Sequence, residues 1–143
     1  MSLEIHHRER EGIEILDLKG RLTLGDEDLL FRDELQRLCR SEKRNIILNL
    51  GEVSDIDSLG VGTLVFAHAR LAGIGGRLAL ENLQISHLKL FLLLKLEVVF
   101  DVYDEELDAV NSFFPDRVVA RVDPLELIER LRAKPDEVTR DRS

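Results

Sequence analysis

Residues 45–72 read NIILNLGEVSDIDSLGVGTLVFAHARLA, and the interpretation of the whole chain starts from this stretch. It opens on a short apolar run, Ile46 to Leu50, which is typical of a strand covered on both faces. The polar segment Gly51–Asp57 then predicts a tight acidic loop. Apolar residues three and four positions apart follow, and this spacing predicts a helix that begins at Ser58.

Ser58 stands at the junction between this loop and this helix, where an N-cap residue belongs. A serine hydroxyl in that position accepts hydrogen bonds from the unpaired N–H groups of the first helical turn. The helical spacing also predicts which face of the helix turns toward the core. That face consists of Val61, Leu64, Val65, His68, Leu71 and Ala72.

The segment Asp55-Ile56-Asp57-Ser58-Leu59-Gly60-Val61-Gly62 lies between an I-I-L-N-L strand and an apolar helix. In this setting it resembles the phosphoacceptor segment of the STAS family, the anti-sigma factor antagonists. Further matching points follow in the family's order at Gly20-Arg21-Leu22, Gly75–Leu80 and Leu96–Asp104, so that the resemblance spans roughly residues 3–114. The chain departs from the family at Leu59, where Ser, Thr or Ala is usual, and at Lys95, where a helix-ending glycine is common.

The remaining chain fits an α/β fold with one mixed sheet. Alternating residues predict strands at 3–6 and 13–18, joined as a β-hairpin by a turn at 8–12, and a second turn at 20–25. Later strands are expected at 77–81 and 97–102, and helices from Asp26, at 84–94 and at 104–114. The order β-β-α-β-α-β-α-β-α, with about four helices, predicts parallel later strands and is also the STAS order.

Side-chain patterns within these elements predict parts of the core. The first helix has acids at its start and Phe31, Leu35 and Leu38 at core spacing. Cys39 is the single cysteine, so no disulfide can form within one chain. It lies on the same side of this helix as Leu35 and Leu38, and a buried thiol is expected. The last helix of the STAS-like part is expected to use Leu107, Val110 and Phe114.

The end of the chain differs from the rest, so we divide the sequence into a STAS domain at residues 1–114 and a C-terminal extension at 115–143. Val118, Val119 and Val122 suggest a strand. Asp123-Pro124 is an N-cap followed by proline at the first helical position. Leu127, Ile128 and Leu131 then form one apolar stripe, before a polar end that we expect to be frayed. This extension either docks on the domain or binds a partner.

Composition restricts the class of protein. A length of 143 residues with 44% hydrophobic and 34% charged residues fits one globular domain. A net charge of −8, with no basic patch, argues against nucleic-acid binding. No stretch approaches the roughly 20 apolar residues of a membrane span. We therefore expect a cytoplasmic protein that forms a monomer or a weak homodimer.

Three functions compete at Ser58. Nucleophilic catalysis lacks the glycine that a nucleophile elbow places two residues earlier, where Ile56 stands. It also lacks a base, because His68 lies roughly 15 Å further along the helix. Metal binding by Asp55 and Asp57 would need further oxygen ligands. In the third function Ser58 is a phosphorylation switch, whose phosphate would face the positive end of the helix dipole.

The STAS resemblance favours the switch. It implies a bacterial, non-enzymatic domain whose unphosphorylated form binds an anti-sigma factor with serine kinase activity and a Bergerat-type ATP site. It further implies release by phosphorylation of Ser58 and resetting by a metal-dependent serine phosphatase. We expect the partner to contact Asp55, Asp57, Ser58, Leu59, Gly60 and Gly62, and we expect no catalytic residue, cofactor or metal site. A constitutive STAS scaffold, in a signalling or transport-associated complex, is the alternative, and a small α/β enzyme is the third class.

Overall fold

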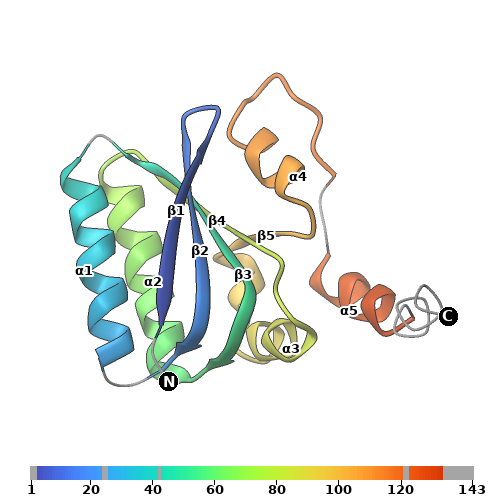
Figure 1. The fold of residues 1–143 in the computed structure, drawn as a ribbon. Coiled ribbons are helices and arrows are strands. Elements are labelled where there is room, and N and C mark those ends of the chain that lie inside the picture. The colour runs from blue at the N-terminus through green and yellow to red at the C-terminus, as the bar shows by residue number, and fades with distance from the viewer. Residues whose placement is uncertain (1–2, 24–25, 42, 121–122, 134–143) are drawn as a thin grey trace, which may run out of the picture.

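The structure is a computed structural model that describes residues 3–23, 26–41, 43–120 and 123–133. Helices follow strands after an opening hairpin in the predicted order, with one more helix in the C-terminal extension (Figure 1). The elements are β1 (Glu4–Arg10), β2 (Ile13–Leu22), α1 (Asp26–Arg40), β3 (Asn45–Ile56), α2 (Ser58–Gly73), β4 (Arg77–Glu81), α3 (Ile85–Leu93), a 3₁₀ helix (Leu96–Val98), β5 (Asp101–Tyr103), α4 (Glu106–Asn111) and α5 (Pro124–Arg132).

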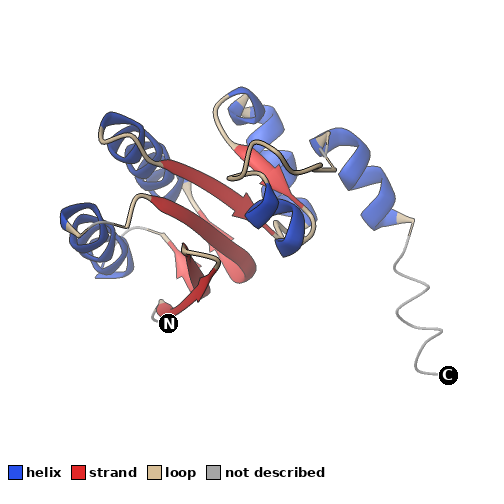
Figure 2. Ribbon diagram, turned by 90° about the horizontal axis from the view of Figure 1, so that it is seen from above, coloured by secondary structure: helices blue, strands red, loops and turns tan. Residues whose placement is uncertain are grey.

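The strands of the described residues form one mixed sheet in the order β1-β2-β3-β4-β5. β1 is antiparallel to β2, and the other neighbouring strands are parallel. Parallel neighbours need a crossover connection, and α1, α2 and α3 provide these connections. Helices lie on both sides of the strands when the molecule is seen from above (Figure 2). The predicted α/β architecture is therefore confirmed.

Two clusters of buried apolar side chains, one on each face of the sheet, hold these layers together. In β3, Ile46 and Leu48 belong to the larger cluster, which also contains side chains of α1, α2, α3 and α5. Ile47 points the other way and belongs to the smaller cluster, which contains Ala109 and Val110 of α4. The predicted burial of β3 on both faces is confirmed.

The opening hairpin is tighter than predicted. The turn predicted at residues 8–12 is wrong at 8–10, because β1 continues to Arg10, which pairs with Ile13. Only Glu11 and Gly12 form the turn, and both have left-handed φ angles, 53° and 84°, as a two-residue type I′ hairpin requires. The charged side chains of β1 are exposed while its backbone pairs with β2, so their polarity does not mark a turn.

β2 and β3 both extend further than predicted. The turn at 20–25 is wrong at 20–22, and the loop at 51–57 is wrong at 51–56, because these two segments pair in parallel with each other. Gly20 lies opposite Val53, and Leu22 lies opposite Ile56. Each segment satisfies the backbone groups of the other, which local composition cannot reveal. Residues 24–25 of the predicted turn lie outside the described residues.

The core faces of α1 and α2 are mostly as predicted. Phe31, Leu35 and Leu38 of α1 are buried, and Cys39 packs partly buried against the same cluster. In α2, the predicted Val61, Leu64 and Leu71 are buried, and His68 is partly buried. Val65 and Ala72 are exposed, so the prediction is wrong for these two residues, and Thr63 and Ala67 are buried in addition.

The chain between α3 and α4 departs from the prediction. The strand predicted at 97–102 is wrong at 97–100, where a 3₁₀ helix precedes β5 and leaves Val98 83% exposed. Lys95, with a left-handed φ of 58°, redirects the chain at the end of α3. The helix predicted at 104–114 is shortened to α4, and its Leu107 is 52% exposed. Its core face is Ala109 and Val110, with Phe114 partly buried.

The C-terminal extension packs on the domain through α5. The predicted cap is confirmed, since the Asp123 side chain accepts a hydrogen bond from the backbone N–H of Leu125. Leu127 and Ile128 are buried in the cluster that also contains Leu88 and Phe91 of α3. The predicted strand is wrong at residues 118–120, and Val122 lies outside the described residues. The division into residues 1–114 and 115–143 stays a prediction.

Candidate functional site at the start of α2

Helix α2 is capped by Asp57, not by Ser58 as predicted. Asp57 has extended backbone angles, φ −101° and ψ −176°, and its carboxylate accepts a hydrogen bond of 2.9 Å from the backbone N–H of Gly60. β3 continues to Ile56, so Asp57 is the single residue between strand and helix. Ser58 is therefore the first residue of α2, and its side chain is exposed and not used as the cap.

Exchanging the two candidate caps tests this assignment. We expect Asp57→Ala to reduce the free energy of unfolding by about 1 kcal/mol, the usual cost of losing an N-cap side chain. Ser58→Ala is the matched control and is expected to leave stability nearly unchanged. Urea denaturation of the two variants and the wild type measures both effects. A larger loss of unfolding free energy in Ser58→Ala than in Asp57→Ala would show that Ser58 is the N-cap residue.

Gly60 places the start of α2 against the end of β2. A Cβ atom at Gly60 would lie 2.1 Å from the carbonyl oxygen of Leu22. The backbone N–H of Asp57 also donates to that oxygen, at 3.4 Å. Gly60 is buried, so we assign it a packing role, beneath the surface on which it was predicted to contact a partner. Only glycine lets these two segments approach so closely.

The solvent side of the site combines apolar side chains, a glycine and the serine. Ser58, Gly62 and Val65 lie on one stripe of α2, because they are four and three residues apart. Val65 is 37% exposed and Leu59 is 39% exposed, while a Cβ atom at Gly62 would meet nothing within 4 Å. Asp55 is exposed at the end of β3. We call Asp55, Ser58, Leu59, Gly62 and Val65 the α2 contact surface.

Arg21 is a neighbour of this site that the sequence did not single out. Arg21, Thr23, Asp55, Ile56 and Asp57 line a surface depression. The Arg21 Nε atom lies 3.9 Å from the Asp55 carboxylate. The Gly20-Arg21-Leu22 match placed Arg21 in the family pattern, but only the pairing of β2 with β3 brings it to Asp55. One arginine therefore offsets part of the negative charge near Ser58.

His87 is a second residue that the sequence did not connect with the site. It is buried at the start of α3, and burial lowers its pKa, against the effects of the Ser54 backbone and the Asp55 carboxylate. His68, the histidine nearest to Ser58 in sequence, instead packs its ring edge-on against Phe100, with 5.5 Å between centroids. Within the described ranges, no three His, Cys, Asp or Glu residues are grouped as a metal site.

The protein is a small α/β domain, with an opening β-hairpin and three helical crossovers. It carries an exposed serine, Ser58, at the start of its second helix. The sequence profile of the STAS domain matches residues 4–109, and the chain belongs to the STAS domain family. Over the residues that the structure describes, no helix is both long enough and apolar enough to cross a membrane.

Solved structures of anti-sigma factor antagonists have the same fold. One is a putative anti-sigma factor antagonist from Thermotoga maritima, with a TM-score of 0.71 and 21% identity over 76% of this chain and 92% of that chain. An anti-sigma factor antagonist from Mycobacterium paratuberculosis has a TM-score of 0.69 and 15% identity over 78% and 93%. Phosphorylated SpoIIAA from Bacillus has a TM-score of 0.62 and 20% identity over 77% and 99%. At these identities the likeness concerns the fold.

Proposed function

We propose that this protein is a bacterial anti-sigma factor antagonist that acts as a phosphorylation switch in the cytoplasm. In its unphosphorylated form it binds an anti-sigma factor with serine kinase activity through the α2 contact surface. That kinase phosphorylates Ser58 and thereby releases the domain, and a serine phosphatase restores the binding form. The domain itself performs no catalysis. Membership of the STAS family and the anti-sigma factor antagonists among its structural neighbours support this proposal.

The observation that carries the proposal is the position of Ser58 outside the cap. Because Asp57 closes the first turn of α2, a phosphate on the exposed Ser58 removes no hydrogen bond of the cap. A phosphate at the first helical residue is also favoured by the helix dipole. Modification therefore leaves the domain folded, and its energetic effect falls on the partner complex.

The composition of the contact surface explains why binding would depend on this charge. Leu59 and Val65 provide exposed apolar area, and Gly62 leaves room for a partner to approach the helix closely. Such a surface binds by excluding water. A phosphoserine adds about −1.5 to −2 charges at pH 7 beside Asp55 and Asp57, and a desolvated charge of that size opposes docking.

Phosphorylation by the anti-sigma factor kinase tests the proposal. The purified protein is incubated with the kinase and ATP, and intact mass followed by peptide mass identifies the modified residue. We expect one phosphate, on the peptide that contains Ser58, and none in Ser58→Ala. A stable complex with that partner and no phosphate on Ser58 would favour the alternative, a constitutive STAS scaffold.

A further inference from the structure

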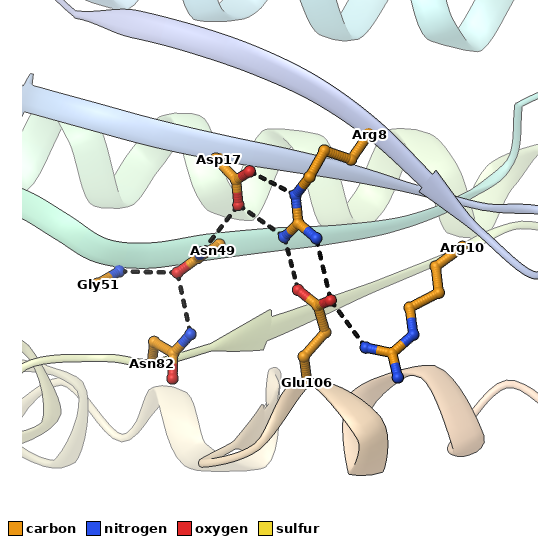
Figure 3. A network of polar contacts seen from close by, with 7 residues as sticks. All are labelled: Arg8, Arg10, Asp17, Asn49, Gly51, Asn82 and Glu106. Carbon is orange, nitrogen blue, oxygen red and sulfur yellow. Dashed lines mark hydrogen bonds and ion pairs between the residues drawn. The ribbon is translucent and has the colours of Figure 1, made fainter.

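A polar network crosses the face of the sheet that carries α4. It links β1, β2 and β3 to the start of α4 through side chains (Figure 3). The residues drawn there are Arg8, Arg10, Asp17, Asn49, Gly51, Asn82 and Glu106. Glu106, the first residue of α4, is held by two arginines of the edge strand β1 that precede it by almost a hundred residues.

The contacts of Glu106 are short and directed. Arg8 donates to both of its carboxylate oxygens, at 2.6 and 3.1 Å, and Arg10 donates to one of them at 3.0 Å. Arg8 also donates to both oxygens of Asp17, at 2.6 and 2.9 Å. The hydrogen bonds from Arg8 are the main reason that the pKa of Glu106 is lowered to about 2. In this network two arginines therefore balance two ionised carboxylates.

A third carboxyl group, on Glu81, borders the network and lacks such partners. Glu81 is the last residue of β4, paired with Asn49 of β3 and Tyr103 of β5. Its side chain is 0% exposed, and within the described part of the chain neither carboxylate oxygen receives a hydrogen bond from a donor. An ionised carboxylate in such a place is costly, because nothing replaces the water that it loses.

We propose that Glu81 is a carboxylic acid in the folded protein at neutral pH, and that its O–H group donates a hydrogen bond to the Glu106 carboxylate, which joins β4 to α4. The proton supplies the donor that Glu81 otherwise lacks. It also leaves the set of Arg8, Arg10, Asp17, Glu81 and Glu106 without net charge, whereas an ionised Glu81 would add one buried negative charge.

The groups that face Glu81 agree with this assignment. Three charged groups act on Glu81: Glu106 of α4, Arg8 of β1 and Asp17 of β2. From β5 it faces Tyr103, whose hydroxyl is bound by Arg77 at 3.1 Å. Burial, followed by the hydrogen bond to Glu106 and the repulsion from its charge, raises the pKa of Glu81 to about 9, and Arg8 opposes this only in part.

The proton has a predictable effect on stability. The pKa of Glu81 is raised on folding from its ordinary 4.5 to about 9, so the folded state holds a proton that the unfolded state loses in this range. Stability therefore falls as pH rises through this window. Relative to Glu81→Gln, which keeps the shape without the ionisation, the unfolding equilibrium constant of the wild type should increase up to tenfold per pH unit.

Two measurements on the full chain test the proposal. Carbon NMR of the glutamate side-chain carboxyls should show Glu81 titrating well above pH 7 in the wild type, and at a lower pH by at least one unit in Glu106→Gln, whose amide can donate to Glu81. Urea denaturation from pH 5 to 9 should show the wild type losing stability relative to Glu81→Gln. Glu105→Gln, which alters an exposed neighbour that makes no capping hydrogen bond, should behave like the wild type.

A Glu81 carboxyl that titrates near pH 4.5 in the wild type would overturn the proposal without any variant. An unchanged titration in Glu106→Gln would show that burial alone holds the proton and would overturn the pairing with α4. Neither result depends on partner binding, so this proposal is tested independently of the proposed switch at Ser58.

Discussion

Ser58→Asp should weaken binding to the anti-sigma factor partner by roughly 100-fold or more, with little change in melting temperature. Ser58 is exposed on the first turn of α2, next to Asp55 and Asp57. Covering an added negative charge there costs desolvation and like-charge repulsion of several kcal/mol, and about 1.4 kcal/mol corresponds to tenfold in affinity. Within the isolated domain the same charge is favoured at a helix N-terminus by roughly 0.3–1 kcal/mol.

Calorimetric titration with the purified partner and thermal unfolding of the isolated domain measure the two halves of this prediction. Ser86→Asp is the matched control, because Ser86 is an exposed serine on the first turn of α3. We expect the control to bind like the wild type. An unchanged affinity in Ser58→Asp would favour the constitutive scaffold, and an equal loss in both variants would indicate a general effect of charge.

Gly60→Ala should be the most destabilising single-methyl change in the site, with a loss of about 3 kcal/mol. The added Cβ atom would lie 2.1 Å from the Leu22 carbonyl oxygen. That oxygen is a backbone atom of β2, so it cannot move aside by a change of rotamer. The start of α2 must therefore shift off the end of β2. Urea denaturation gives the loss, and the backbone amide shifts of Asp57 and Val61 report the displacement.

Gly62→Ala provides the contrast, two residues further along the same helix. Nothing lies within 4 Å of the added methyl group, and alanine inside a helix is favoured over glycine by roughly 1 kcal/mol. We expect equal or higher stability together with weaker partner binding, because the methyl group fills the space that the partner approaches. Similar stability losses for both glycines would contradict the distinction between the buried and the exposed position.

The order of elements could be predicted because each relies on local patterns. Val98 and Val99 show the limit of this reasoning, because a β-branched pair suggests a strand, but after the left-handed Lys95 Val98 ends an exposed 3₁₀ helix and Val99 follows it. Asp123-Pro124 shows where local patterns suffice. The cap residue and the proline together define the start of α5, independently of the surface on which the helix packs.

The N-cap of α2 was predicted to within one residue, since the structure places it at Asp57 and the sequence placed it at Ser58. Asp57 and Ser58 are both good N-cap residues, and the choice between them depends on where β3 ends. β3 ends later than its polar composition suggests, because it pairs with the second half of β2. Arg21 and His87 were missed for a related reason, since the pairing of β2 with β3 brings Arg21 to Asp55, and the packing of α3 brings His87 near Ser54.

Glu81 was beyond sequence reasoning. A glutamate at the end of a strand is usually solvated, and nothing in residues 77–81 indicates that the Glu81 side chain is buried. Its environment comes from α4 and from β1, and the arginines of β1 lie far from Glu106 in sequence. Contacts across such separations leave no periodic pattern in the sequence.

The edge strand β1 has a consequence for behaviour at high concentration. Its outer backbone groups are open to pairing with another chain, and an uncovered edge of this kind can seed fibrils. Strand β1 reads EIHHRER, so that all of its residues except Ile5 are acids, histidines or arginines, and all except Ile5 are exposed. A second molecule that extended the sheet would have to desolvate this row of charged side chains, which disfavours pairing of β1 with another chain.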